Sequence, residues 1–371
     1  MRSLRFLSLL LAAAAFAGAA GNPAYYAYIG TYTGHGSQGI YVYRFEPVTG
    51  TLTSLGLAVS TDNPSFMAVN STGTYLYAVN EVEGGGVSAF RIDRGSGMLS
   101  LINRVFSGGS SPCALTVDRT GRFLLVANYG SGSVSLFPIK RDGSLAKASA
   151  FDQHHGSSID LQRQHTPHAH SASFSPDDRF ALSADLGMDR VFIYRLDPLR
   201  GKLTTVGYGG VAAGSGPRHL AFHPNGKFAY VISELTSTVT AFQWADGALK
   251  PIATVPALPP DYRGPKSGAE IQVHPTGKFL YASNRGEAND IAIFKIDVAT
   301  GKLTPAGHVA SGGRTPRSFS VDPSGQYLFV ANQDSNNVVV FHIDPETGGL
   351  TPTGKSVSLS SPVAVQFINA P

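Results

Sequence analysis

A pattern of proline, glycine, an aromatic residue and asparagine recurs along the chain, and it limits the fold more than any other feature of the sequence. In the first copy, Pro64 and Gly73 precede an apolar stretch that opens at Tyr75 and ends at Asn80. The copies occupy Pro64–Asn80, Pro112–Asn128, Phe174–Asp185, Pro217–Ser233, Gly268–Asn284 and Pro316–Asn332. Copies spaced roughly fifty residues apart are typical of a repeat architecture, in which every copy is one structural unit.

Each copy continues with the same kinds of segment. An alternating apolar and polar stretch follows the asparagine, as in Val87–Ile92 and Val338–Ile343. An Asp-x-x-x-Gly-x-Leu turn comes next, as in Asp297–Leu303, and leads into a last short strand. Four strands of period two, joined by turns rich in Gly, Asp and Asn, predict a four-stranded antiparallel blade of a β-propeller.

The two ends of the chain predict the number of blades. Tyr26–Thr31 resembles a second strand and Gly39–Phe45 a third strand, but no first strand precedes them. The tail Ser361–Ile368 resembles the missing strand. We therefore expect an all-β, seven-bladed β-propeller whose ring is closed by the C-terminal strand pairing into the first blade. An open row of blades is the alternative, and the unmatched half blade at each end argues against it.

Composition removes two other classes of protein. Of the 371 residues, 42% are apolar and 15% are charged, whereas a disordered chain is poor in apolar residues and rich in charge. The single cysteine, Cys113, cannot form a disulfide within the chain. The fold must therefore be held by an apolar core and by strand pairing.

The first twenty residues have the three parts of a secretory signal peptide. Arg2 and Arg5 form a basic start, Leu7–Ala17 is apolar, and Ala17–Ala19 offers small residues for cleavage. We expect a signal peptide at 1–20, a propeller domain at 21–371, and a periplasmic or secreted protein. A buried N-terminal strand or helix is the alternative.

The remaining charge and hydrophobicity limit the choice of partners. Removing Arg2 and Arg5 changes the formal charge from +4 to +2, which gives little support for a nucleic-acid partner. The segment Leu7–Ala17 is too short to span a bilayer, and no other segment approaches the length required. We expect a monomer that binds a small molecule.

Positions near the propeller axis divide into those that repeat and those that vary. The start of each first strand and the end of each second strand meet on one face, near the axis. Residues that repeat there are interpreted as structural: Asn80, Asn128, Asn284 and Asn332, and in the blade turns His223, His274 and Asp322. Residues that vary are free to bind a ligand: His168, His170, Arg218, His219, Glu234, Glu270, Arg285 and Arg317. These eight fall in the fourth to seventh blades, which predicts a small-molecule site on one side of the channel mouth.

Zinc binding and a cysteine nucleophile are the two other chemistries that residues near the axis suggest. Five histidines lie between His154 and His170, which raises the question of a zinc site. His168 and His170 share one face of a strand without a clear third ligand, so we expect neither a metal nor another cofactor. Cys113 is not expected to act as a nucleophile, because the alignment of the repeats places no histidine beside it.

Several short motifs are spread along residues 25–368: Thr166–His170, Ser175–Asp177, Ala184–Gly187, Gly216–His219, Phe222–Gly226, Tyr230–Glu234, Ala269–Glu270, Ser283–Arg285 and Thr315–Arg317. Together they resemble the propeller-type 6-phosphogluconolactonase family. The family also contains a carboxy-cis,cis-muconate cyclase. The resemblance implies hydrolysis of a sugar lactone, phosphorylated or not, with His170, Arg218, Glu234 and Arg285 as the catalytic set. The variation between blades adds His168, His219, Glu270 and Arg317 as substrate-binding residues.

The resemblance suggests a mechanism and leaves alternatives open. Glu234 or His170 would take a proton from water, and Arg218 or Arg285 would face the developing oxyanion. Arg317 and a second arginine would hold an anionic group. A carboxymuconate-type cycloisomerase, a calcium-dependent lactonase and a non-enzymatic extracellular binding module are the alternatives. The export signal sets this chain apart from cytoplasmic sugar-phosphate lactonases, and so its substrate is open.

Overall fold

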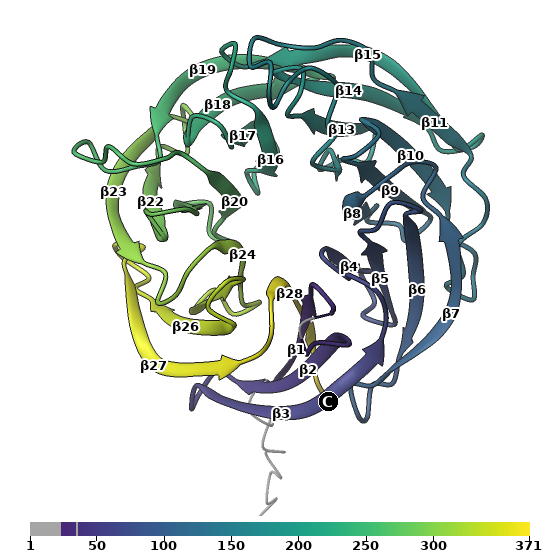
Figure 1. Ribbon diagram of the computed structural model, residues 1–371, viewed down its shortest axis with the longest axis vertical. Helices are drawn as coiled ribbons and strands as arrows, with labels where there is room; N and C mark the ends of the chain where they lie inside the picture. The colour runs from purple at the N-terminus through teal and green to yellow at the C-terminus, as the bar shows by residue number, and fades with distance from the viewer. Residues whose placement is uncertain (1–23, 35) are drawn as a thin grey trace, which may run out of the picture.

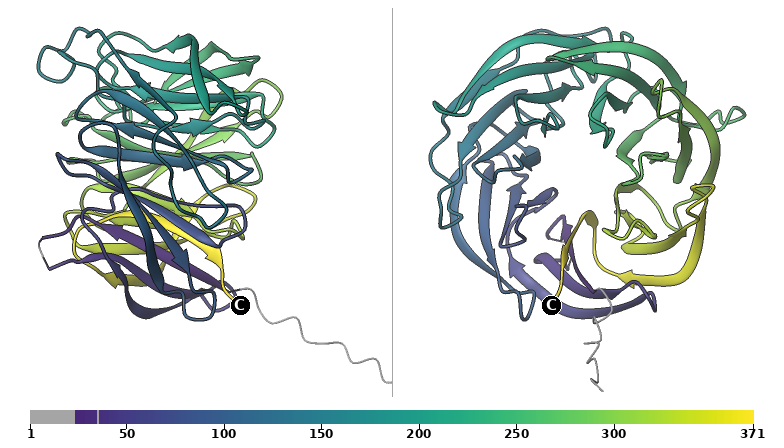
Figure 2. Two further views of the ribbon diagram at one scale, coloured as in Figure 1. Left: turned by 90° about the vertical axis from the view of Figure 1, so that its right-hand side faces the viewer. Right: turned by 180° about the vertical axis from the view of Figure 1, so that it is seen from behind.

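Seven four-stranded antiparallel sheets stand around a central axis in the computed structural model, which describes residues 24–34 and 36–371. Figure 1 shows the sheets as blades of a ring, and the side view in Figure 2 shows that they stack into a thick disc. All 28 elements of the described residues are strands. The predicted all-β, seven-bladed propeller is confirmed, whereas the predicted signal peptide lies outside the described residues. No helix in the described part of the chain has the length and apolarity needed to cross a membrane.

Each blade runs from an inner strand at the axis to an outer strand at the rim. The first blade contains β28 (Pro362–Asn369), β1 (Tyr25–Thr31), β2 (Gly39–Glu46) and β3 (Thr51–Ser60). The second contains β4 (Met67–Val69), β5 (Tyr75–Asn80), β6 (Gly86–Ile92) and β7 (Leu99–Phe106). The third contains β8 (Pro112–Val117), β9 (Phe123–Asn128), β10 (Ser133–Pro138) and β11 (Ala150–Gln153).

The other four blades follow the same order. The fourth contains β12 (Ser173–Phe174), β13 (Phe180–Asp185), β14 (Arg190–Asp197) and β15 (Lys202–Gly210). The fifth contains β16 (Pro217–Phe222), β17 (Phe228–Ser233), β18 (Thr238–Ala245) and β19 (Ala248–Pro256). The sixth contains β20 (Gly268–Val273), β21 (Phe279–Asn284), β22 (Asp290–Ile296) and β23 (Leu303–Ala310). The seventh contains β24 (Pro316–Val321), β25 (Tyr327–Asn332), β26 (Asn337–Ile343) and β27 (Leu350–Ser358).

The ring is closed by pairing between the two ends of the described chain. Strand β28 runs antiparallel to β1, with Tyr25 opposite Asn369 and Ile29 opposite Val365. In Figure 1 the yellow C-terminal strand lies beside the purple β1. The first blade is thus built from both ends of the sequence, as the half blades predicted.

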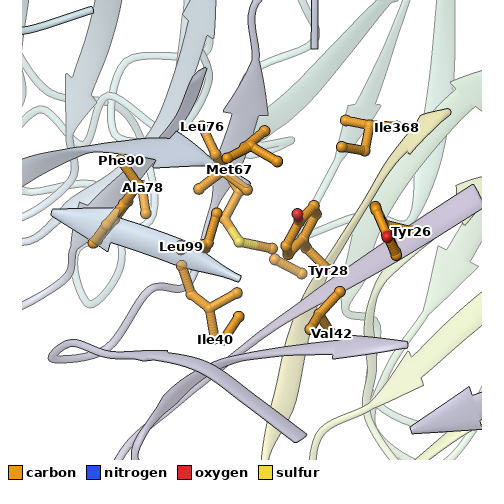
Figure 3. Packing of buried hydrophobic residues seen from close by; sticks show 13 residues of the cluster. Tyr26, Tyr28, Ile40, Val42, Met67, Leu76, Ala78, Phe90, Leu99 and Ile368 are labelled. Carbon is orange, nitrogen blue, oxygen red and sulfur yellow. The ribbon is translucent and has the colours of Figure 1, made fainter. Parts of the chain in front are cut away.

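Apolar side chains fill the spaces between neighbouring blades. Tyr28 and Val42 of the first blade pack against Met67, Leu76 and Phe90 of the second, as Figure 3 shows. All five are at least 96% buried. Burying one such side chain contributes roughly 1.5–3 kcal/mol. The packing therefore fixes each blade against the next and sets where the inner strands begin.

Tyrosine hydroxyls of second strands also join neighbouring blades. Tyr28, Tyr77 and Tyr281 donate to a glycine carbonyl in the turn before the outer strand of the next blade, which is the repeated Asp-x-x-x-Gly turn or its equivalent. The pairs are Tyr28 and Gly97 at 2.8 Å, Tyr77 and Gly143 at 3.1 Å, and Tyr281 and Gly348 at 2.9 Å. These glycines have positive φ, a conformation that residues with a side chain rarely adopt.

The repeated polar residues serve the blades, as predicted. The amide nitrogens of Asn128 and Asn332 donate to the carbonyls of Ser107 and Ser311, which precede the inner strand of the same blade. Asn80 and Asn284 make the equivalent bonds. His223 Nε2 and His274 Nε2 lie 2.9 and 2.8 Å from glycine carbonyls of the next blade. Asp322 accepts from the backbone amides at the start of β25.

Candidate active site

Irregular pairing at the start of the inner strands frees one residue in most blades. Pro217 pairs with Ser233 and His219 with Ile232, so Arg218 stands between two paired positions as a β-bulge. Cys113 and Arg317 occupy the same place in their blades. In the sixth blade the interruption is longer and contains Glu270. Bulges next to binding sites re-aim side chains, and here they bring the predicted ring positions together.

The freed side chains meet at the axis. A cavity of about 10 Å³ lies between six blades and is lined by Ser65, Phe66, Cys113, Arg218, His219, Glu270, Arg317, Ser318 and Val363. Four of the eight predicted site residues are among them. The other four predicted residues do not line the cavity but lie around it: His168, His170, Glu234 and Arg285.

Glu234, at the end of the second strand of the fifth blade, holds three arginines. Its Oε2 lies 3.1 Å from Arg218 Nε and 2.8 Å from Arg285 Nη2, and its Oε1 lies 2.5 Å from Arg163 Nη2. Burial would raise the pKa of Glu234, but Arg285, Arg218 and Arg163 outweigh it and lower that pKa to about 2. A carboxylate with both oxygens occupied and so low a pKa is a poor proton acceptor. This geometry argues against Glu234 as the general base and makes it the anchor of the arginines.

Arg218 is the most deeply placed of these arginines, with 1% of its surface exposed. Besides Glu234, its Nη1 contacts the carbonyl of Ala269 at 2.7 Å and His219 Nε2 at 3.3 Å. Burial and the nearby Arg285 lower the pKa of Arg218 to about 10. The guanidinium therefore remains charged at neutral pH in a site with little access to water.

His219 and Glu270 form a buried pair next to Arg218. His219 Nδ1 lies 3.0 Å from Glu270 Oε1. Burial lowers the pKa of His219 even though Glu270 opposes it. Burial would raise the pKa of Glu270, but His219 and backbone donation lower it. The pair is thus a neutral imidazole that donates to an ionised carboxylate while accepting from Arg218.

Aromatic rings from the third to fifth blades form one wall of the site. Tyr129 stacks on His168 with ring centres 4.5 Å apart, and its edge contacts His170 at 5.2 Å. His170 in turn meets His219 at 5.3 Å. Burial, reinforced by Arg218 and His219, lowers the pKa of His170 well below its ordinary value, so its imidazole is neutral.

Cys113 lies beside this wall, contrary to the expectation that no histidine would be near it. Its Sγ is 3.7 Å from His170 Nδ1, because the bulge in the third blade turns the thiol toward the fourth. Burial raises the pKa of the Cys113 thiol, so the sulfur stays protonated. A protonated, buried thiol is a weak nucleophile.

Arg317 extends the site beyond the four predicted blades. Its Nη2 is 3.8 Å from Glu81 Oε2 of the second blade, and its guanidinium lies over the ring of Tyr32 from the first. Tyr32 and Ser65 also donate to Glu81. Burial would lower the pKa of Arg317, but Tyr32 and Glu81 raise it. The polar groups therefore surround the axis instead of occupying one side.

Arg163 was missed by the sequence reasoning because it lies outside the repeat, in the long connection between β11 and the fourth blade. The same connection contains His154, whose Nδ1 and Nε2 lie 2.6 Å from Asp185 and from the hydroxyl of Tyr194. Asp185 also accepts from the backbone amide of His168. His154 thus helps to hold the segment that presents His168. Within residues 24–34 and 36–371, no three His, Cys, Asp or Glu side chains are placed to hold a metal ion.

Comparison with known proteins agrees with this architecture. The family described as "Lactonase, 7-bladed beta-propeller" matches residues 26–367. A 6-phosphogluconolactonase of Bacillus subtilis (strain 168) is 38% identical over 348 residues, which cover 93% of this chain and 99% of that protein. A 6-phosphogluconolactonase of Formosa agariphila is 40% identical over 304 residues, which cover 80% of this chain and 86% of that protein.

A solved structure of a lactonase is also similar to this chain over nearly its whole length. The periplasmic gluconolactonase of Pseudomonas aeruginosa has a TM-score of 0.89 and 33% sequence identity, and the match covers 94% of this chain and 100% of that one. The chain therefore belongs to the lactonase family of seven-bladed β-propellers, a family of lactone-hydrolysing enzymes.

Proposed function

We propose that this protein hydrolyses sugar lactones at the axial ring of arginines and carboxylates. The observation that supports it most is the group of three arginines bonded to Glu234, two of them largely buried. Opening a lactone places negative charge on the carbonyl oxygen, and fixed positive charge in a site with little water is the most effective stabiliser of that charge. Glu234 holds Arg218 and Arg285 in place, and these two are the residues proposed to face the oxyanion.

The aromatic wall gives the lactone ring a surface to bind. Neutral His170 contacts Cys113 through Nδ1, and its Nε2 is proposed to bind the substrate. His168 and Tyr129 are stacked and cover the neighbouring side. Arg317, whose ion pair with Glu81 is long at 3.8 Å, is proposed to bind a polar or anionic substituent.

The balance of charge favours a substrate without a phosphate group. Four arginines, at 163, 218, 285 and 317, meet three glutamates, at 81, 234 and 270, and the difference is one positive charge. One positive charge matches the single charge of an oxyanion, whereas a phosphate group would bring nearly two more negative charges. A neutral aldonolactone, such as gluconolactone, is therefore the proposed substrate class. The runner-up is a phosphorylated sugar lactone, because two relatives carry the name 6-phosphogluconolactonase.

The predicted export signal agrees with a substrate that has no phosphate group, because phosphorylated sugars are largely confined to the cytoplasm. The basic start, apolar run and small residues within 1–20 support a periplasmic or secreted enzyme. The measurement is the N-terminal sequence of the protein recovered outside the cytoplasm, which we expect to begin near residue 20. Recovery of the intact N-terminus from the cytoplasm alone would contradict export.

Arg285→Ala tests the proposed site. Removing one stabiliser of the oxyanion is expected to lower kcat by about 100-fold or more, measured as proton release from gluconolactone in a pH-stat. Arg314→Ala is the matched control, because Arg314 is exposed and contacts a backbone carbonyl instead of Glu234. The control should keep turnover within about twofold. Equal activity of the two variants would refute the assignment, and comparison with the phosphorylated lactone decides between the substrate classes.

A further inference from the structure

One carboxylate oxygen of Glu270 has few hydrogen-bond partners for a buried charged group. Oε1 lies 3.0 Å from both His219 Nδ1 and the backbone nitrogen of Ile271. Within the part of the chain that the structure describes, Oε2 has one hydrogen-bond partner, the hydroxyl of Ser318, at the long distance of 3.4 Å. An ionised carboxylate can accept about four hydrogen bonds, and Glu270 is 94% buried. A buried charged oxygen with so few partners is costly unless a water molecule or a ligand completes its contacts.

Two cavities are lined by Glu270. The 10 Å³ cavity at the axis is lined by Glu270, Arg218 and Arg317, and its volume is about the minimum needed to hold one water molecule. A larger chamber of about 340 Å³ lies below it along the inner strands and is also lined by Glu270 and Ser318. Glu270 therefore lies where the arginine ring meets the central channel.

A second cavity lies next to this chamber, farther from the site. Gln366 lines both this chamber and a further cavity of about 230 Å³ beside the turn at residues 70–73. That turn follows β4 at the end of the blade opposite the site, and Ser71 and Thr72 in it are exposed. The two cavities thus lie between Glu270 and the face of the disc that is opposite the site.

We propose that Glu270 is the general base of the reaction and that it acts on water supplied through the central channel. In the step, Glu270 Oε2 takes a proton from water while the water oxygen bonds to the lactone carbonyl carbon. The bond from that carbon to the ring oxygen then breaks, and the ring oxygen takes the proton from Glu270. One lactone and one water give one hydroxy acid, and the carboxylate is restored.

The contacts around the two buried glutamates explain why Glu270 has this role. Both oxygens of Glu234 are bonded to arginines, whereas Glu270 keeps one oxygen toward the cavity. His219 fixes the other oxygen of Glu270, as an orienting partner does in many acid–base sites. The variation between blades predicts Glu270 as a substrate-binding residue, whereas the proposal gives it proton transfer. The inference rests on the proposed lactonase function, since it assigns the base of that reaction.

Chemical rescue tests the proposal. We expect Glu270→Gln and Glu270→Ala to lower kcat by about 100-fold or more, because a general base contributes about that much. Formate fits the space vacated in Glu270→Ala and can reach it through the channel, so it should restore turnover at least about tenfold. It should not rescue Glu270→Gln, whose side chain fills that space, nor Glu234→Ala, in which the arginines have lost their anchor.

The controls separate this proposal from the function on which it rests. Wild-type protein is assayed first, and failure to open any lactone would contradict the proposed function itself. With an active wild type, turnover of Glu270→Gln within about fivefold of normal would overturn the role of Glu270. So would equal rescue of Glu234→Ala, or no rescue of a folded Glu270→Ala. If Glu270→Ala fails to fold, the turnover of Glu270→Gln decides, because that side chain has the same shape.

Discussion

Two buried glutamates that act electrostatically on Arg218 differ in the contacts that their oxygen atoms make. Glu234 gives both oxygens to arginines, and its pKa falls to about 2. Glu270 has an imidazole on one oxygen and a cavity on the other. At the scale of the residue, the proton chemistry of each glutamate thus depends on which of its carboxylate oxygens is left free. The arginines of the site also differ in their contacts. Arg218 and Arg285 share a carboxylate, whereas Arg317 lies on an aromatic ring.

The positions of the site residues could be predicted from the sequence, and most of their roles could not. The repeat fixes which residue follows the start of each inner strand, so Arg218, Glu270 and Arg317 were found from spacing alone. Arg163 lies in a connection that no other blade contains, and spacing gives no information there. The role of Glu234 depends on the number of arginines around it, which is a property of the folded ring and not of any one blade.

At the scale of the element, the tyrosine bonds between blades give a matched pair of substitutions. The hydroxyl of Tyr281 donates to Gly348, whereas the hydroxyl of Tyr230, at the same place in the fifth blade, has no partner among the described residues. Tyr281→Phe is expected to cost about 1 kcal/mol, seen as a lower midpoint of thermal unfolding. Tyr230→Phe should leave the midpoint unchanged or raise it. Equal losses in both variants would show that these hydroxyl bonds do not hold the blades together.

The fourth blade shows where prediction of elements reached its limit. Its second strand was predicted correctly at Phe180–Asp185, because it follows the repeat. Its inner strand β12 is reduced to Ser173–Phe174, and the residues before it are held by contacts to Asp185 and Tyr129. Asp185 replaces the usual asparagine there and pairs with His154 from the long connection. This substitution was visible in the sequence, but its partner could be identified only in the fold.

At the scale of the whole molecule, closure of the ring places residues from all seven blades around one axis. The pairing of β28 with β1 brings Tyr32 and Glu81 to Arg317, which lies near the other end of the chain. The half blades at the two ends predicted this closure. They did not predict that the polar ring would continue across it, because contacts between side chains of different blades depend on how the disc packs.

The most direct test of the account is proton release by the wild-type protein with gluconolactone in a pH-stat, before and after treatment with a chelator. Because charge stabilisation is assigned to arginines and proton transfer to a carboxylate, we predict lactone opening well above the spontaneous rate and unaffected by the chelator. A rate no faster than spontaneous hydrolysis for every sugar lactone, phosphorylated or not, would contradict the account, as would activity that the chelator abolishes.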